Sequence, residues 1–445
     1  MKTPELLLPA GTLAKMRTAY AFGADAVYAG QPRYSLRARN NEFTLDGLRT
    51  GIREAHALGK KLFVASNLMP HNAKVKTYMA DMAPVIEMQP DALIMADPGL
   101  IAMVRERWPE MPIHLSVQAN TVNYAAVKFW KSLGLSRVIL SRELSLDEIE
   151  EIRQQCPDIE LEVFIHGALC IAYSGRCLLS GYFNHRDANQ GTCTNSCRWD
   201  YKVDSAAEDG TGDIQKIDFD FDKALSESPL SDCGSQPRHP EADKVYVISR
   251  QDHPGELMPV LEDEHGTYIM NSKDLRAVEH VERLVKIGID SLKVEGRTKS
   301  IYYVARTAQV YRHAIDDAMK GRPFNLALLG ALDALASRGY TDGFYERHHT
   351  HEQQNYLRGH SESFRQQYVG DIVACAGGMA EIDVKNKFSV GDKLEIIHPS
   401  GNHIVELKEM KNLEGIAVTV APGSGHRVRI PLQGELAKGM VARFI

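Results

Sequence analysis

Short apolar runs alternate with amphipathic segments between residues 5 and 297. The runs are rich in Val, Ile and Leu and are bounded by Gly, Pro or Asn, which is typical of buried strands. They are ELLLPAG, DAVYAG, KKLFVASN, DALIMADPG, PIHLSVQAN, SRVILSREL, LEVFIHG and, after a long interruption, SLKVEGR. The intervening segments show helical spacing. In residues 145–155, for example, Ser145 and Glu148 predict a capping box ahead of a helix whose apolar face includes Ile149 and Ile152.

Strands that alternate with helices pair in parallel through right-handed crossovers. DAVYAG follows ELLLPAG closely and is set aside as either a rim strand or a miscount. The number of runs then comes near the eight of a (β/α)8, or TIM-like, barrel, and a doubly wound sheet is the alternative. The barrel is favoured because several runs end in polar residues, and the carboxyl ends of barrel strands converge on one catalytic mouth. Each of these residues could instead cap the following helix: Asn67, Asp97, Gln118, Asn120, Arg142, Glu143, His166, Glu295 and Arg297.

The rest of the chain predicts an insertion, a linker and a second domain. Residues 1–335 are expected to form the barrel, interrupted at residues 198–243 by an acidic segment with little periodicity that we interpret as a flexible surface insertion. Residues 336–367 are expected to be a linker. In residues 368–445 short alternating runs with turn signals predict a small antiparallel β-barrel or sandwich.

Composition and charge narrow the class of protein only slightly. The chain has 445 residues, of which 44% are apolar and 25% charged, as in ordinary globular proteins. No long apolar stretch or charged leader is apparent, so we expect a cytoplasmic protein without a membrane partner. The net charge is −6, but residues 200–243 hold twelve acidic and four basic residues, which leaves 48 basic and 46 acidic residues elsewhere. Charge therefore neither supports nor excludes an RNA partner.

Four of the seven cysteines lie close together, as Cys170, Cys177, Cys193 and Cys197, with the spacing C-x6-C-x15-C-x3-C. A reducing compartment disfavours disulfides, so metal ligation or redox chemistry is expected. Structural zinc prefers tight C-x2–4-C pairs, which only the second pair resembles, whereas the wide first gap suits a bulkier iron–sulfur cluster. Spacing alone leaves an iron–sulfur site, a zinc site and unligated thiols open.

The three remaining cysteines carry weaker expectations. Cys156, near the end of a predicted helix, and Cys375, in a predicted strand, are interpreted as packing or surface thiols. Cys233 lies in the acidic insertion and is an alternative to Cys197 as a fourth ligand.

The stretch EVFIHGALCIAYSGRCLLS resembles the signature of the collagenase-like peptidase family, whose peptidase mechanism is unassigned. The resemblance continues through PAG (residues 9–11), GADAVYAG, LSVQAN, MNSKDL, SLKVEGRTKS and VKNKFSVGD, and so covers nearly the whole chain. The pattern is most similar to members that support 5-hydroxyuridine formation at the wobble position of tRNA. Other members hydroxylate a ribosomal RNA cytidine or act in oxygen-independent ubiquinone hydroxylation. The resemblance thus implies a tRNA uridine C5 hydroxylase with tRNA as its partner.

The resemblance also implies two small components. In those relatives four cysteines hold a 4Fe-4S cluster and prephenate is required. The ligand role maps onto Cys170, Cys177, Cys193 and a fourth cysteine that varies between branches, for which Cys197 is preferred and Cys233 is the alternative. Hydroxylation at C5 needs such a cofactor because no amino-acid side chain performs it unaided.

The strand-end residues are expected to serve this chemistry. Prephenate carries two carboxylates, which Arg142 and Arg297 are suited to bind in bidentate fashion, with Lys273 as another cation. Glu295 would orient Arg297 or take a proton, and His166 would donate or accept one. Each residue could instead belong to a structural ion pair or be buried and satisfied by backbone.

The remaining predicted contacts concern RNA. Tyr28 and Gln118 are expected to stack on a base or hydrogen-bond to it, and Asn271, in the MNSKDL motif, to bind substrate. An unpaired wobble base can enter a pocket without the cost of melting a duplex. The C-terminal domain would either grip the tRNA backbone or serve stability or dimerisation. Its candidate phosphate contacts are Lys385, Lys387, Lys393, Arg427 and Arg429.

Two other functions compete with hydroxylation. A peptidase receives little support, because HEQQN at residues 351–355 has Asn355 where the motif H-E-x-x-H needs histidine, and no G-x-S-x-G elbow precedes a helix. His348, His349 and His351 could bind a metal, although histidines clustered in a linker are commonly solvated. The other alternative is a tRNA-binding scaffold stabilised by structural zinc.

Overall fold

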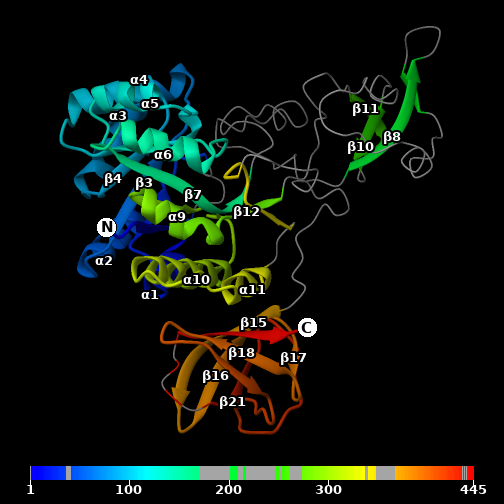
Figure 1. Ribbon diagram of the computed structural model, residues 1–445. Coiled ribbons are helices and arrows are strands. Elements are labelled where there is room, and N and C mark those ends of the chain that lie inside the picture. The colour runs from blue at the N-terminus through cyan, green and yellow to red at the C-terminus, as the bar shows by residue number, and fades with distance from the viewer. Residues whose placement is uncertain are drawn as a thin grey trace.

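The structure is a computed structural model (Figure 1). It describes residues 2–36, 42–169, 201–208, 214–216, 246–250, 253–260, 273–335, 339–346, 366–432, 434, 436 and 438–445. These residues form a barrel surrounded by helices, a small separate sheet, and a C-terminal β-domain.

Eight parallel strands close into the predicted barrel. They are β1 (Glu5–Pro9), β2 (Ala26–Gly30), β3 (Lys61–Ser66), β4 (Ala92–Met95), β5 (Ile113–Leu115), β6 (Arg137–Ile139), β7 (Glu160–Ala168) and β13 (Ser291–Val294). Each strand pairs with the next along the chain, and β13 pairs with both β7 and β1 to close the ring. The interpretation of DAVYAG as a rim strand or a miscount is wrong. This run contains β2, which follows β1 closely because the crossover between them is the short helix α1 (Leu13–Ala21).

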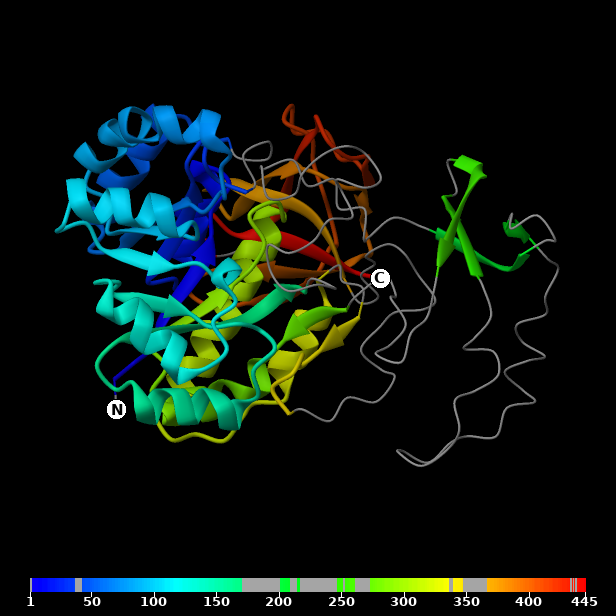
Figure 2. The same cartoon turned by 90° about the horizontal axis from the view of Figure 1, so that it is seen from above.

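Helices cover the outside of the barrel in both views (Figures 1 and 2). After α1 they are α2 (Leu45–Ala57), α3 (Asn72–Glu87), α4 (Pro98–Arg107), α5 (Tyr124–Ser132), α6 (Leu146–Gln155), α9 (Val281–Ile287), α10 (Ile301–Met319) and α11 (Ala327–Asp333). The capping box predicted at Ser145 and Glu148 is confirmed at the start of α6, with Ile149 and Ile152 buried against the core. Cys156 ends this helix as a buried free thiol, and burial raises its pKa.

Two short strands extend the barrel sheet beyond β7. The strand β12 (Asp274–Arg276) runs antiparallel to the end of β7, and β14 (Tyr340–Thr341) pairs in parallel with β12. Further along, the Tyr345 hydroxyl donates a 2.5 Å hydrogen bond to the carbonyl oxygen of Phe164 in β7. Residues 339–346 therefore belong to the barrel, and the linker expected from residue 336 begins too early.

Part of the expected flexible insertion is regular structure. The strands β8 (Tyr201–Glu208) and β9 (Ile214–Lys216) lie within residues 198–243 and join β10 (Tyr246–Arg250) and β11 (His253–Val260) in an antiparallel sheet of order β11-β10-β8-β9. The sequence pattern failed here because β8 pairs with β10, some forty residues later, and local periodicity carries no sign of such a partner.

The C-terminal domain is an antiparallel half-barrel, and the predicted fold class of this domain is confirmed. Its six-stranded sheet contains β15 (Gln366–Ala376), β16 (Met379–Val384), β18 (Lys393–Ile397), β19 (His403–Glu406), β21 (Arg427–Pro431) and β22 (Met440–Phe444). The strands β17 (Phe388–Ser389) and β20 (Val420–Ala421) form a separate pair. In β16, alternate residues Ala380, Ile382 and Val384 are buried, so one face of the sheet forms a core of its own.

The helix α10 is packed between the barrel and the half-barrel. Its Arg306 side chain is only 2% exposed and donates from Nη1 to Glu395 of β18 at 3.1 Å, and from Nη2 to Gln366 of β15 at 3.0 Å. The rings of Tyr302 and Tyr368 stack across the same junction, with their centroids 5.3 Å apart. The two domains are thus joined by a buried ion pair and an aromatic contact.

Replacing Arg306 should destabilise the protein strongly. Arg306→Met should lower the free energy of unfolding by about 3 kcal/mol, because it leaves the Glu395 carboxylate without its cation at a mostly buried position. Urea denaturation followed by circular dichroism measures this change. Arg322→Met is the matched control, since the pair of Arg322 with Asp317 is largely exposed and should contribute less than about 1 kcal/mol. Equal losses from the two substitutions would contradict the role of the junction.

A candidate active site at the mouth of the barrel

A cavity of about 120 Å³ opens at the carboxyl ends of the barrel strands. Its wall carries three cationic side chains and one carboxylate, together with two aromatic rings and several polar side chains. These are Arg142, Lys293, Arg297, Glu295, Tyr28, Phe164, Asn67, Ser116 and Gln118. Five of the eight residues predicted for catalysis or substrate binding therefore meet in one place: Tyr28, Gln118, Arg142, Glu295 and Arg297. The excess of positive charge favours an anionic ligand.

Arg142 forms one side of the cavity from the loop between β6 and α6. Its guanidinium lies over the ring of Phe164, 4.0 Å from the centroid, and Nη1 donates to the carbonyl oxygen of Ala168 at 2.8 Å. Its Nε is buried and has no hydrogen-bond partner within the described chain. The stacked ring fixes the plane of the guanidinium in the cavity wall.

Arg297 forms another part of the rim, on the segment after β13, and is 7% exposed. Its Nη1 donates a 2.6 Å hydrogen bond to the hydroxyl of Ser35, and its guanidinium lies 5.7 Å from the centroid of the Tyr28 ring. The backbone at Arg297 is held as well, because Lys15 donates to its carbonyl oxygen at 3.3 Å. Gly11 of the PAG motif lies against the same carbonyl, where a Cβ atom would overlap the oxygen. This close approach explains why glycine occupies that position.

Gln118 belongs to the cavity wall and has an unused hydrogen-bond donor. The side chain is 2% exposed, and its Oε1 accepts a 3.1 Å hydrogen bond from the hydroxyl of Ser116. Its Nε2 is buried with no partner among the residues that the structure describes. Because leaving a buried donor unpaired costs about 1–3 kcal/mol, a ligand with an acceptor at this position would gain that much.

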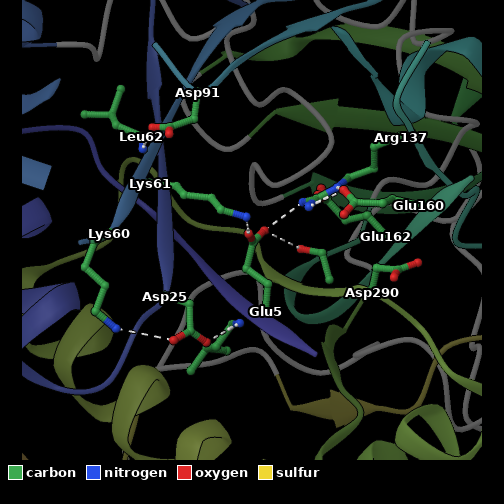
Figure 3. Close-up of polar contacts among 12 residues, drawn as sticks. Glu5, Asp25, Lys60, Lys61, Leu62, Asp91, Arg137, Glu160, Glu162 and Asp290 are labelled. Carbon is green, nitrogen blue, oxygen red and sulfur yellow. Dashed lines mark hydrogen bonds and ion pairs between the residues drawn. The ribbon is translucent and has the colours of Figure 1, made fainter. Parts of the chain in front are cut away.

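Below the cavity, the interior of the barrel is charged. Glu162 of β7 is fully buried, and its two oxygens bind Lys293 Nζ at 2.7 Å and Arg137 Nη1 at 3.0 Å. Arg137 also reaches Glu5 at 2.7 Å, and Figure 3 shows Glu5 between Arg137 and Lys61 at this end of the barrel. Desolvation lowers the pKa of Lys293 most, Glu162 raises it, and the net pKa lies below the ordinary value. The floor of the cavity is therefore a cation held by a buried carboxylate.

Tyr28 lines the cavity between the two upper cations. Its hydroxyl donates to the carbonyl oxygen of Val294 at 3.1 Å, and Lys293 Nζ lies 4.5 Å from the ring centroid. Burial is the main cause that raises its pKa, so the phenol is neutral. The ring face is occupied by cations, which leaves the predicted stacking on a base without support.

His166 does not line the cavity, and its predicted role as a proton donor or acceptor stays a prediction. Strand alternation would place it on the inner face with Glu162 and Phe164. A β-bulge at Ile165 shifts the register against β13 and turns His166 outward, where its ring packs against Tyr303, Tyr311 and Tyr340. Its Nδ1 lies 3.2 Å from the Tyr311 hydroxyl, and burial lowers the pKa to about 3.

The next residue, Gly167, has φ of +108°, and a Cβ atom there would lie 2.5 Å from the carbonyl oxygen of Glu295. The bulge and this glycine together set the approach of β7 to the loop that carries Glu295. The backbone amide of Glu295 donates to the carbonyl of His166 at 2.8 Å, so the signature IHG positions a cavity residue through its backbone.

Other predicted residues lie elsewhere. Lys273 precedes β12 and packs beside Gly339, outside the cavity wall. Asp97 caps α4 by accepting from the amide of Leu100, as the helix-cap alternative foresaw, and Glu143 accepts from Ser141. Outside the described residues lie Asn271, the histidines of residues 348–351, and five cysteines: Cys170, Cys177, Cys193, Cys197 and Cys233.

The basic residues of the half-barrel are mostly paired with side chains of the same domain. Lys385 binds Asp383 at 2.7 Å, and both Arg427 and Arg429 bind Glu381. Lys393 lies 5.3 Å from the centroid of the Phe444 ring. These pairs reduce the positive charge that is available to bind a phosphate backbone. The tRNA contact predicted for this domain stays a prediction.

Sequence reasoning missed Lys293, Ser35 and Glu162. Lys293 and Glu295 alternate in SLKVEGR, and Glu162 and Phe164 alternate in LEVF, so each pair lies on one face of its strand. Charged residues at alternate positions of a barrel strand signal a polar interior. That signal was available, but only strand ends were considered.

Comparison with known proteins agrees with this architecture. Peptidase family U32 matches residues 11–355, and the Peptidase family U32 C-terminal domain matches residues 365–443. This chain belongs to peptidase family U32.

Two relatives of this U32 chain illustrate the range of the family. The "tRNA hydroxylation protein P" of Escherichia coli is 60% identical over 437 residues, which cover 98% of this chain and 95% of that protein. The "23S rRNA 5-hydroxycytidine C2501 synthase" of the same species is 29% identical over 83% of this chain and 46% of its own length. A solved U32 peptidase structure aligns with a TM-score of 0.37 at 11% identity over 44% of this chain and 82% of that chain, a likeness too distant to add to the argument. Among the described helices, none is long and apolar enough to cross a membrane.

The outward position of His166 predicts a specific pH dependence of stability. With a folded pKa of about 3 and an unfolded pKa of about 6.5, the unfolded chain binds the proton first, so stability falls as the pH drops below about 6.5. Between pH 7 and pH 5 the wild type should therefore lose about 2 kcal/mol more than His166→Gln in urea unfolding. His403→Gln, which removes an exposed histidine, should follow the wild type. Parallel pH profiles for wild type and His166→Gln would contradict this assignment.

Proposed function

We propose that this protein hydroxylates RNA, and that its substrate is the wobble uridine of tRNA, which it converts to 5-hydroxyuridine with prephenate as co-substrate and a 4Fe-4S cluster as cofactor. The names of the relatives support RNA hydroxylation: several U32 proteins that resemble most of this chain are called tRNA hydroxylation proteins. The names of these tRNA hydroxylation proteins say nothing of the position on the base, the co-substrate or the cluster, and these three points are our own additions to the proposal.

The observation that carries the proposal is the charge and size of the barrel cavity. Its wall offers Arg142, Lys293 and Arg297 against the single carboxylate Glu295, together with the unpaired amide of Gln118. A site of this kind suits a small acid with two carboxylates, such as prephenate. At about 120 Å³ it admits a small molecule or a single base. An unpaired loop nucleotide satisfies that limit, whereas a base in a duplex would first have to be extruded.

The cluster would be bound by cysteines that come after strand β7 in the sequence. The strand β7 ends at Ala168, whose carbonyl oxygen accepts from Arg142 in the cavity wall, and Cys170 follows two residues later. A bound cluster would supply the redox chemistry that side chains lack. The side chains of the cavity would hold and orient the co-substrate and exclude water. Zinc in place of the cluster is the alternative.

The described geometry gives a peptidase less support. In the described part of the barrel, no histidine hydrogen-bonds a serine or cysteine side chain, so a nucleophile–base pair is absent there. The group His280, Asp342 and Glu346, with ligand atoms within 4.8 Å of one another, could hold a metal ion but lies outside the cavity wall. If a metal-stripped preparation still cleaves gelatin, peptidase activity would replace RNA hydroxylation as the favoured function.

Cysteine substitutions test the cluster and the reaction together. In a strain lacking the gene, the wild-type protein should restore 5-hydroxyuridine-derived nucleosides, whereas Cys170→Ala and Cys193→Ala should not. Cys156→Ala is the matched control, because that thiol lies at the end of α6. Mass spectrometry of tRNA nucleosides reads the outcome.

Unchanged nucleosides in the deletion strain would refute the reaction itself. Iron and sulfide assays on anaerobically purified protein separate the cofactors, and zinc without iron would refute the cluster. If Cys197 is the fourth ligand, Cys233→Ala should retain the modification.

Arg142 tests the co-substrate. Arg142→Gln should raise the prephenate concentration for half-maximal hydroxylation about tenfold or more, because it removes a charge-assisted contact with a carboxylate. Arg322→Gln, at an exposed helix end far along the chain, is the control. A prephenate requirement that does not change in Arg142→Gln would place the acid elsewhere.

A further inference from the structure

Lys293 is the most deeply placed cation of the cavity. It is 3% exposed, and its Nζ bonds Glu162 at 2.7 Å, while the rings of Tyr28 and Phe164 lie 4.5 Å and 5.4 Å away. A lysine enclosed by one carboxylate and two ring faces has lost nearly all its water, and a buried charge of this kind is retained only with firm partners. Nζ has three protons, and Glu162 is its one hydrogen-bond acceptor among the described residues. At least one N–H is thus directed at the rings or the cavity.

Glu162 is itself held in place. Its second oxygen accepts from Arg137 Nη1 at 3.0 Å, and Arg137 is anchored by Glu5 at 2.7 Å and by Glu160. Lys293, Arg142 and Arg297 together face only Glu162 and Glu295, so the cavity keeps a net positive charge after these carboxylates are counted. Lys293 therefore keeps electrostatic attraction for an anion in the cavity above it.

We propose that Lys293 is a ligand-binding residue that contacts an acidic group of the small-molecule co-substrate at the floor of the cavity, and that Glu162, itself held by Arg137, is the positioning residue that holds Lys293 and favours its charged form. This assignment rests on the proposed function for the nature of the co-substrate, but it concerns residues that neither the strand-end pattern nor the rim arginines include. The ligand class is a small carboxylic acid with two acidic groups, one bound at the floor by Lys293 and the other at the rim by Arg142 and Arg297.

The surroundings of Lys293 give this binding a pH dependence. Desolvation lowers its pKa most, Glu162 raises it, and Arg137 and Arg297 lower it further, so the net effect is a lowered pKa. Tyr28 faces it as a neutral phenol, and His114 of β5 is neutral because burial lowers its pKa far below the usual range. Lys293 therefore loses its proton at a lower pH than an exposed lysine, and anion binding weakens as the pH rises through that point.

Calorimetric titration with malonate, a simple dicarboxylate, tests the assignment on the full-length protein prepared anaerobically. Lys293→Met should weaken malonate binding about tenfold or more. Lys293→Arg keeps the positive charge, so it should retain binding and abolish its loss at high pH. Lys286→Met, an exposed lysine on α9, is the matched control and should bind malonate as the wild type does.

Glu162→Gln tests the positioning role of Glu162 through the pH midpoint of malonate binding, which a change in packing alone would not shift. Loss of the carboxylate should shift the pH midpoint of malonate binding downward, since Lys293 then loses the partner that favours its charged form. A midpoint that is unchanged would refute the role of Glu162.

The proposal is overturned if malonate fails to bind the wild type, if Lys293→Met binds as tightly as the wild type, or if the loss at high pH persists in Lys293→Arg. Because Lys293→Arg is charged and close in size, it answers the question even if Lys293→Met does not fold. Malonate binding is independent of the nucleoside assay. Lys293-dependent binding without any tRNA modification would refute the proposed reaction and leave the anion site intact.

Discussion

A fully buried carboxylate connects the closure of this barrel to the chemistry of its mouth. Glu162 has no exposed surface, and its burial is tolerable only because Lys293 and Arg137 neutralise it from neighbouring strands. Those strands, β13 and β6, flank β7, and β13 also closes the ring by pairing with β1. Arg137 of β6 also pairs with Glu5 of β1, so this network is complete only when β1 closes the ring, and the network holds the Lys293 cation directly beneath the cavity. Removing one partner would leave a buried charge on the others.

The interior is layered along the barrel axis. Glu5, Arg137 and Glu162 form a charged layer near the amino ends of the strands, and Figure 3 shows these three side chains together with Lys61. Above it lie the rings of Tyr28 and Phe164, and the guanidinium groups of Arg142 and Arg297 lie at the mouth against those rings. Aromatic faces attract cations from both sides. The rings thus keep the positive charges close together without direct contact, which concentrates positive potential where a ligand would enter.

The sequence predicted the barrel and much of its mouth because strand periodicity and strand ends are local features. Tyr28, Gln118, Arg142, Glu295 and Arg297 were found in this way and do line one cavity. His166 was misplaced because a single extra residue in β7 reverses the inward and outward faces, and the apolar run around it looks the same with or without a bulge. Lys293 was overlooked because a lysine inside a barrel is explained only by Glu162, more than a hundred residues earlier. Pairing between distant strands also hid β8 and β9.

The C-terminal half-barrel influences the cavity through α10 rather than by lining it. The segment that carries Glu295 and Arg297 leads within a few residues to Ser300, the N-cap of α10. One face of this helix holds the barrel, since the Tyr303 hydroxyl donates to the carbonyl of Glu295 at 2.7 Å and the Tyr311 hydroxyl to that of Ile165. Another face holds the half-barrel through Arg306 and Glu395. Because one rigid helix carries both sets of contacts, a change at the domain junction would reach the rim of the cavity through the backbone of residues 295–300. A domain with no residue in the described cavity wall would thereby contribute to the geometry of the site.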